Sequence, residues 1–391
     1  MALSGGKDRH GDFTGGGGAG KIRVLYLSLH DPRAPLTGSA VRAAGFLRVF
    51  ARRFDTHLIH FEGSGQPPLP DRPPPRPIEG LRSSTAIPFR RTGYFLYSRG
   101  FYRAAVRAAA REKPDLIVCD YGTSALYGLL LRRRGGPPFL YSSHNLEYRG
   151  SLDKARSDPR RLLLAPFVYA VERAGVRWAM LTAAINEEEA AHYRRWAAPE
   201  RVAVVPQGFD EEVFHPFYEP PRNRRKTILF CGNFGIPFNR EALRIAAERI
   251  VGPVAERLPD VLFRFVGARP PEGAGGPNLE MTGFVDDYPA LLRGADLVIS
   301  PMRRGRGSPT KIIEALACGK PVVATAVGAR SLEKDYAGLR IASVEEFPAR
   351  ILEALDRNRP VEAVDFDRLR SRYSWSVIVG ELSDRLEGMV R

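Results

Sequence analysis

Cysteine is scarce in this chain: three of its 391 residues are cysteines, at positions 119, 231 and 318. They lie far apart, and their spacing matches neither a disulfide framework nor a zinc site. We expect free thiols, a reducing compartment and no structural metal held by cysteine.

Long apolar runs are also missing, although hydrophobic residues make up 44% of the chain. No run approaches the roughly 20 residues that a membrane span needs. Residues 1–20 are glycine-rich and lack the apolar core of a signal peptide, so we interpret them as a disordered leader. We therefore expect a cytoplasmic protein, with peripheral attachment to the inner face of a membrane left open. A chain of this length favours two domains.

Acidic residues are too few to balance the basic ones, and the formal net charge is +15. Residues 72–113 hold ten basic and two acidic residues, a net +8. Nucleic acid, an anionic membrane surface and phosphorylated substrates are the partner classes that this charge favours. Because no nucleic-acid recognition motif is present, we do not expect a nucleic-acid partner.

Residues 300–328 form the most informative stretch, which we interpret as strand end, glycine loop, helix, turn and strand. Ser308 is expected to cap the helix, Pro309 to open it and Gly319 to end it. A helix N-terminus behind a glycine loop is a seat for phosphate, and Lys311 adds a positive charge there. Glu314 lies on the same helix face, where a carboxylate can hold a ribose. An ordinary βαβ unit with a solvent-facing lysine is the alternative.

The first half of the chain alternates apolar runs with helical patterns, which favours an α/β fold with parallel sheets. We expect strands at 22–29, 56–61, 114–121 and 139–145 and a helix at 41–53 that follows Gly38 and Ser39. Ligands of such sheets gather beyond the carboxyl ends of the strands. His144, at the end of the fourth strand, is therefore a candidate site residue, although a single histidine is more often structural.

Two further segments bear on the interpretation. Residues 85–107 interleave aromatic residues with arginines, which indicates either a membrane-facing or acceptor-binding element, or a helix with its aromatics in the core. Residues 159–196 form a long helical region that we expect to be broken near Pro166 and again around residues 181–186.

Several segments, in order, resemble one enzyme family. They are SSHNLEYR at 142–149, VAVVPQGFDEEVF at 202–214, TILFCGNFGIPFNREAL at 227–243, and GFVDDYPALLRGADLVISP with GSPTKIIEALACGKPVVAT within 283–325. These segments resemble the retaining GT-B glycosyltransferases of family 4, also called glycosyl transferases group 1. The resemblance covers about residues 22–391 and implies two Rossmann-like, doubly wound domains that face a central cleft.

The resemblance also implies a division of labour. Residues 21–218 would form an acceptor-binding domain, to which the terminal helix 375–391 returns, and residues 219–374 a nucleotide-sugar-binding domain. His144, Lys311 and Glu314 would be catalytic, and His144, Asn145 and Arg149 would bind the acceptor. The donor would contact Gly38, Ser39, Gly232, Asn233, Asn239, Arg240, Phe284, Val285, Gly307, Ser308, Pro309, Thr310, Lys311 and Glu314.

One departure concerns the donor sugar. Many family members carry E-x7-E with the second glutamate at Glu314, whereas Arg306 occupies the first position here. The resemblance nevertheless implies transfer of a sugar from a nucleotide diphosphate sugar to a glycan, a lipid-linked or a small-molecule acceptor, in cell envelope polysaccharide synthesis. Because no DxD-like pair stands in the cleft loops, we expect no metal and no other cofactor. An epimerase of the same fold and a non-catalytic nucleotide-sugar-binding protein stay open as alternatives.

Overall fold

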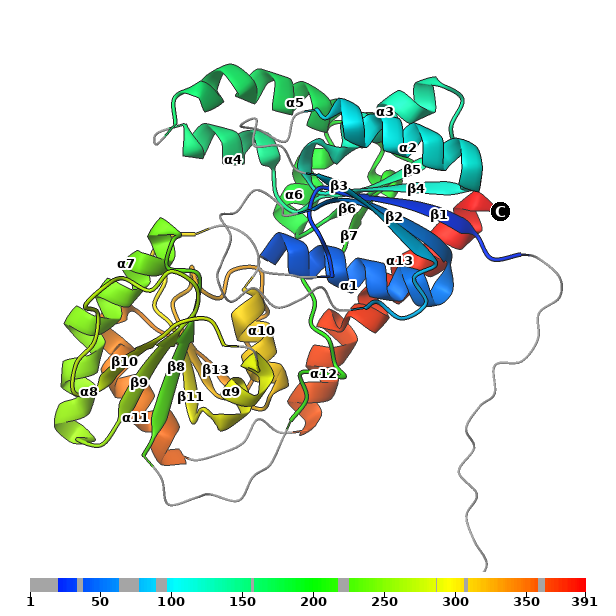
Figure 1. Ribbon diagram of the computed structural model, residues 1–391. Helices are drawn as coiled ribbons and strands as arrows, with labels where there is room; N and C mark the ends of the chain where they lie inside the picture. The colour runs from blue at the N-terminus through cyan, green and yellow to red at the C-terminus, as the bar shows by residue number, and fades with distance from the viewer. Residues whose placement is uncertain are drawn as a thin grey trace, which may run out of the picture.

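The chain forms two lobes, each built on a twisted parallel sheet with helices on both faces (Figure 1). The computed structural model describes residues 20–33, 38–62, 77–88, 97–155, 158–216, 225–285, 287–305, 309–357 and 363–391. The α/β class expected from the sequence is therefore confirmed. None of the described helices combines the length and the apolar character needed to cross a membrane.

The sheet of the first lobe has the strand order β3-β2-β1-β4-β5-β6-β7 within the described residues. Its strands are β1 Arg23–Ser28, β2 Asp55–Glu62, β3 Ser83–Pro88, β4 Leu116–Asp120, β5 Phe139–Ser142, β6 Leu181–Ala184 and β7 Val202–Val204. Its helices are α1 Gly38–Arg53, α2 Arg99–Glu112, α3 Ala125–Arg133, α4 Glu147–Lys154, α5 Arg160–Trp178 and α6 Glu187–Tyr193. The order reverses between β1 and β4, which is where such sheets bind ligands.

The sheet of the second lobe has the order β10-β9-β8-β11-β12-β13 within the described residues, and it reverses between β8 and β11. Its strands are β8 Thr227–Cys231, β9 Leu262–Val266, β10 Leu279–Thr282, β11 Leu297–Ser300, β12 Val322–Ala324 and β13 Leu339–Ile341. The helices that follow β8 are α7 Pro237–Ala246, α8 Gly252–Arg257, α9 Tyr288–Gly294, α10 Thr310–Ala317, α11 Phe347–Arg357, α12 Ala363–Tyr373 and α13 Trp375–Val390.

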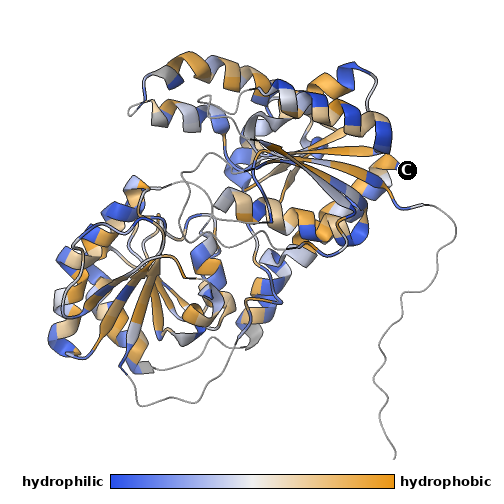
Figure 2. Cartoon of the chain, viewed as in Figure 1, coloured by the Kyte–Doolittle hydropathy of each residue, from blue (hydrophilic) through white to orange (hydrophobic). Residues whose placement is uncertain are grey.

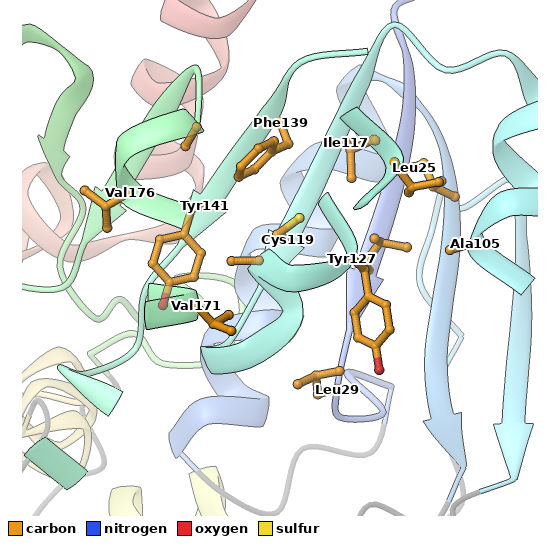
Figure 3. Packing of buried hydrophobic residues seen from close by; sticks show 14 of the residues in the cluster. Leu25, Leu29, Ala105, Ile117, Cys119, Tyr127, Phe139, Tyr141, Val171 and Val176 are labelled. Carbon is orange, nitrogen blue, oxygen red and sulfur yellow. The ribbon is translucent and has the colours of Figure 1, made fainter. Parts of the chain in front are cut away.

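Apolar runs in the central strands give each sheet a core on both faces, because helices cover both sides. In the first lobe, Leu25, Ile117 and Phe139 of neighbouring strands belong to the same hydrophobic cluster as Tyr127 of α3 (Figure 3). The opposite face of the same sheet is covered by α1 and α13. The colouring of Figure 2 follows this pattern, with hydrophobic strands inside and polar residues on outer helix faces.

Helix α13 packs against α1 of the first lobe, although α12 before it packs against α10 of the second (Figure 1). The crossing is fixed by the Phe209 amide, which donates to the Tyr373 carbonyl at 2.8 Å, and by the Trp375 amide, which donates to the Phe209 carbonyl at 3.0 Å. Trp375 leaves no space for side chains beside it: a Cβ at Gly45 would lie 2.3 Å from its ring, and one at Gly208 would lie 2.8 Å away. Two glycines therefore allow the close approach.

Three local expectations are corrected. Pro166 lies inside α5 and does not break it. The proline removes the hydrogen bond to the Leu162 carbonyl, but both residues lie on the exposed face of the helix, where that carbonyl is accessible to water. Residues 83–88, which overlap the interleaved stretch 85–107, form the edge strand β3 with alternating burial. Helix α10 begins at Thr310 with Pro309 as its N-cap residue, one position later than the sequence suggested.

Candidate functional site

Polar side chains converge where β1, β4 and β5 end, at the reversal of the first sheet. His144 lies two residues after β5, and its Nε2 lies 2.9 Å from Oδ1 of Asp120, the last residue of β4. The hydroxyl of Ser28, the last residue of β1, donates to the other Asp120 oxygen at 3.4 Å. The carboxyl edge of the sheet thus brings the predicted His144 to an aspartate that the sequence analysis missed.

The contact with Asp120 defines the state of His144. Because a carboxylate accepts, the Nε2–H group of the imidazole donates, which leaves Nδ1 without a proton in the neutral ring. Nδ1 is buried and has no hydrogen-bond partner among the described residues. Burial lowers the pKa of His144, while the Asp120 carboxylate opposes that shift. His144 is therefore a neutral, oriented imidazole near pH 7.

An aromatic residue joins a second histidine to this group. The ring of Tyr121 lies 5.2 Å from that of His144 and 4.6 Å from that of His30, which follows β1. Burial, aided by the nearby His144, lowers the pKa of His30 to about 4. This group therefore brings two uncharged imidazoles, those of His30 and His144, together around Tyr121 beside Asp120.

The segment after His144 is held by a buried glutamate of α5. Both carboxylate oxygens of Glu172 accept hydrogen bonds from the first backbone amides of α4, Glu147 at 3.0 Å and Tyr148 at 3.2 Å. The hydroxyl of Tyr193 donates to Glu172 at 2.8 Å and also lies 3.3 Å from the Asn145 carbonyl. The position of Asn145 therefore depends on α5. Burial raises the pKa of Glu172 to about 7.

The other residues expected in the first lobe lie on α4 and α1. Arg149 is on the exposed side of α4, where its guanidinium contacts Tyr148 at 3.2 Å. Gly38 and Ser39 form the first turn of α1, after β1. One turn further, Arg42 is fully buried and donates to the Pro206 carbonyl at 2.9 Å.

In the second lobe the predicted donor loop follows β8. The Gly232 amide donates to the Val266 carbonyl at 2.9 Å, and the amide group of buried Asn239 donates to the Asn233 carbonyl at 2.9 Å. A Cβ at Gly267 would lie 1.9 Å from the Gly232 carbonyl oxygen, so the two backbones touch. Arg240 is exposed, and its Nε donates to the Phe234 carbonyl at 3.2 Å. Backbone and side-chain hydrogen bonds thus hold the loop, and the exposed guanidinium of Arg240 lies beside it.

Helix α10 brings Lys311 and Glu314 together above the end of β8. The amine of Lys311 is buried 4.5 Å above the ring of Phe230 and has no hydrogen-bond partner among the described residues. Burial lowers its pKa to about 8. Burial raises the pKa of Glu314 to about 8, opposed by a hydrogen bond from Tyr288 and by the charge of Lys311. A buried ammonium without a hydrogen-bond partner is costly, so this position favours an incoming anion.

The start of α10 is only partly described. Pro309 accepts from the Ile312 amide at 2.9 Å, and Thr310 is the first helical residue. Gly307 and Ser308, like Arg306, lie outside the described residues. On the near side of that gap, the Gly305 carbonyl accepts a hydrogen bond from Arg330, whose Nε also donates to Val327 at 3.0 Å. A second guanidinium thus borders the glycine loop.

The expected base-side turn follows β10. Phe284 is 36% exposed, and Val285 packs against the core of the second lobe. Asp287, half of the acidic pair at 286–287, caps α9 by accepting from the Ala290 amide at 2.9 Å. Its carboxylate therefore has a structural role.

Sequence reasoning missed Asp120, Glu172, Tyr288 and Arg330. Asp120 had a partial signal, because it is the next-to-last residue of the predicted strand 114–121, but pairing it with His144 required the order of the strands. Glu172 had none, since one acid within a helical pattern indicates neither burial nor partners. The roles in acceptor and donor binding given to the predicted residues stay predictions.

Known proteins show the same architecture. Among solved structures, Anabaena HepE in complex with UDP and glucose matches with a TM-score of 0.66 at 16% identity, over 94% of this chain and 99% of that one. Sucrose-phosphate synthase from Thermosynechococcus elongatus matches with a TM-score of 0.67 at 19% identity, over 94% and 99%. At these identities the likeness shows the fold, which is GT-B.

Sequence relatives identify the family. The family model described as Glycosyltransferase Family 4 matches residues 36–213, and the one described as Glycosyl transferases group 1 matches residues 225–357. A D-inositol 3-phosphate glycosyltransferase of Salinispora arenicola is 30% identical over 362 residues, 78% of this chain and 77% of the relative. Another, from Stackebrandtia nassauensis, is 27% identical over 93% of this chain and 90% of the relative. The chain belongs to the family 4, group 1 glycosyltransferases of GT-B fold and is a nucleotide-sugar glycosyltransferase.

Proposed function

We propose that the second lobe binds the nucleotide diphosphate sugar at the N-terminus of α10. The observation that carries this is the Lys311 amine, which is buried, lacks a hydrogen-bond partner among the described residues and lies one helical turn from Glu314. A diphosphate would supply the missing counter-charge, and the helix dipole would add to the attraction. Arg240 would reach the same anion, and Glu314 would hold the ribose hydroxyls.

The first lobe would bind the acceptor at the carboxyl ends of β4 and β5. In the proposed retaining reaction, the bond from the sugar C1 to the diphosphate oxygen breaks, and an acceptor hydroxyl bonds to C1 on the same face. The hydroxyl proton passes to an oxygen of the departing diphosphate. Lys311 and Arg240 would stabilise the negative charge that develops there, and His144, fixed by Asp120, would line the space between acceptor and donor sugar.

The acceptor class is supported from two sides. The sequence relatives are named for D-inositol 3-phosphate, which makes a phosphorylated polyol the first acceptor to test. The net charge of +15 suits such a substrate and equally suits a lipid-linked one at an anionic membrane, within cell envelope synthesis. Residues 85–107 were one candidate for membrane contact. Of their described part, α2 buries Phe101 and exposes Arg99, Arg103 and Arg107, an ordinary amphipathic packing.

The test is turnover of UDP-, GDP- and dTDP-sugars, first with a phosphorylated polyol and then with a lipid phosphate as acceptor. We expect release of the nucleoside diphosphate that depends on the acceptor, and a glycoside with the anomeric configuration of the donor. Epimerised sugar without glycoside would indicate the epimerase alternative, and binding without turnover a non-catalytic protein.

The same assay tests the metal. Because cationic side chains and a helix N-terminus would meet the diphosphate charge, we expect activity to persist in EDTA. Complete loss that Mg²⁺ or Mn²⁺ restores would contradict metal independence.

A further inference from the structure

Helix α5 exposes an apolar face that no other described part of the chain covers. Leu162 is 55% exposed, Leu163 is 82% exposed and Phe167 is 41% exposed. Pro166 and Ala170 are exposed beside them. These residues recur every three to four positions and so share one side of the helix. Leu152 of the adjacent α4 adds a fourth large apolar side chain, 44% exposed.

The rest of that helix face is basic. Arg173 and Arg177 continue the exposed stripe toward the C-terminal end of α5. The one acidic residue of the helix, Glu172, points inward and is 2% exposed. Every α5 side chain that the structure places in solvent is therefore apolar, aromatic or positively charged, which is unusual for the outer face of a helix in a water-soluble protein.

A surface pocket lies at the C-terminal end of the same stripe. It has a volume of about 440 Å³ and is lined by Arg177, Trp178, Arg195, Trp196 and Arg201, among others. Trp178 is 66% exposed at its rim. Guanidinium groups bind phosphate in a bidentate manner, and tryptophan favours the boundary between membrane and water. From Leu162 to this pocket the helix extends about 22 Å, at 1.5 Å per residue.

We propose that the outer face of α5, with the pocket at its C-terminal end, docks the protein on an anionic phospholipid membrane. The leucines and Phe167 would enter the interfacial region while the arginines bind lipid phosphates, the division expected of a helix that lies in the membrane plane. Figure 1 shows α4 and α5 as a hairpin at the outer edge of the first lobe, and Figure 2 shows hydrophobic residues along it.

This inference rests on the proposed function where it concerns a lipid-linked acceptor. Helix α4 begins three residues after His144, and Glu172 of α5 binds the first amides of α4. Docking of α5 would therefore hold the segment His144–Asn145 at a fixed position relative to the bilayer, where a lipid-linked acceptor enters from the membrane.

The experiment is co-sedimentation of the full chain with vesicles of phosphatidylcholine alone or mixed with phosphatidylglycerol. We expect binding to the mixed vesicles that weakens with salt. Leu163→Ser combined with Phe167→Ser should lower the partition coefficient about tenfold or more, and Arg173→Gln combined with Arg177→Gln should do the same. Matched controls are Met389→Ser, an exposed apolar residue of α13, and Arg257→Gln combined with Arg370→Gln on the second lobe; both should bind as the wild type does.

The proposal is overturned if the wild type ignores anionic vesicles at low salt, or if either α5 double variant binds them normally. It is also overturned if the wild type is a dimer that Leu163→Ser with Phe167→Ser separates, because the face then belongs to a second copy of the chain. All α5 variants should keep wild-type turnover with a soluble acceptor. Absence of turnover in every protein, wild type included, would count against the proposed function and leave the vesicle result to decide this inference.

Discussion

The amine of Lys311 and the carboxyl group of Glu314 are both buried in the second lobe and have similar pKa values. Burial moves the pKa of the amine down and that of the carboxyl up, both to about 8. An approaching diphosphate would reverse the shift of the amine, because a nearby anion favours the charged form. Binding of the donor should therefore be coupled to proton uptake.

Lys311→Ala should weaken binding of a nucleoside diphosphate by about 1.5–3 kcal/mol, the range for hydrogen bonds to charged groups. In the wild type the affinity should fall as the pH rises above about 8, since the free amine then loses its proton. Calorimetry in buffers of different ionisation enthalpy measures both effects. Glu314→Gln removes the second titrating group and keeps the amine, so it separates the contribution of Lys311 to the pH dependence from that of Glu314. Unchanged affinity in both variants would remove this helix from the donor site.

His30 predicts a dependence of stability on acid pH. Its pKa is about 4 in the folded chain and about 6.5 in an unfolded one, so the unfolded state binds the proton first as the pH falls. The free energy of unfolding should decrease between pH 6.5 and 4, by up to about 3 kcal/mol from this residue. Chemical denaturation across that range measures it. His30→Asn should flatten the decrease, and an equally steep decrease in the variant would assign it to other groups, His144 first.

At the scale of elements, Glu172 couples two helices. It accepts from both leading amides of α4 while it belongs to α5, so it acts as a distant N-cap residue. Its raised pKa of about 7 means that stability is lost as the pH rises from about 4.5 to 7, because the unfolded carboxyl ionises first.

Glu172→Ala should destabilise the protein by about 1–3 kcal/mol, the penalty for leaving buried donors unsatisfied. The opening should be local, so the amides of Glu147 and Tyr148 should exchange with deuterium faster than those of β4. Hydrogen exchange followed by NMR or mass spectrometry measures this. Glu172→Gln retains one acceptor, so its stability and amide exchange should lie between those of the wild type and those of Glu172→Ala. Uniform acceleration over the whole first lobe would show a global rather than a local role.

The elements also show what the sequence determines. Buried strands and the Gly319 stop of α10 were predictable, because apolar runs and a glycine at φ 72° follow from local chemistry. The edge strand β3 was not, since its pattern depends on pairing with β2, which no local signal encodes. Pro166 was misjudged because its cost depends on whether water can reach one carbonyl. Similarly, His144 was found at a strand end, but its partner Asp120 required the order of the strands.

For the whole molecule, the packing of Trp375 against Gly45 and Gly208 joins α13 to α1, more than three hundred residues earlier in the chain. Gly45→Ala should destabilise the first lobe by about 1–3 kcal/mol, because the added methyl group overlaps the indole ring. Thermal unfolding measures the loss. Trp375→Leu in the same background should recover part of it by making space, whereas Gly252→Ala, at a glycine with no neighbour within 4 Å, should cost far less. Equal effects of the two glycine variants would contradict a specific contact.

The return of α13 also has a consequence for synthesis on the ribosome. Phe46 and Phe50 of α1 lie in a core that includes Trp375, Val379 and Leu386. More than three hundred residues separate α1 from α13 in the sequence. Because ribosomes add roughly 5–20 residues per second, α13 is synthesised about 15 to 60 seconds after α1. During that interval the apolar residues of α1 that later pack against α13 are exposed, while the second lobe is still being synthesised. Nascent chains should therefore be chaperone clients until α13 has been translated.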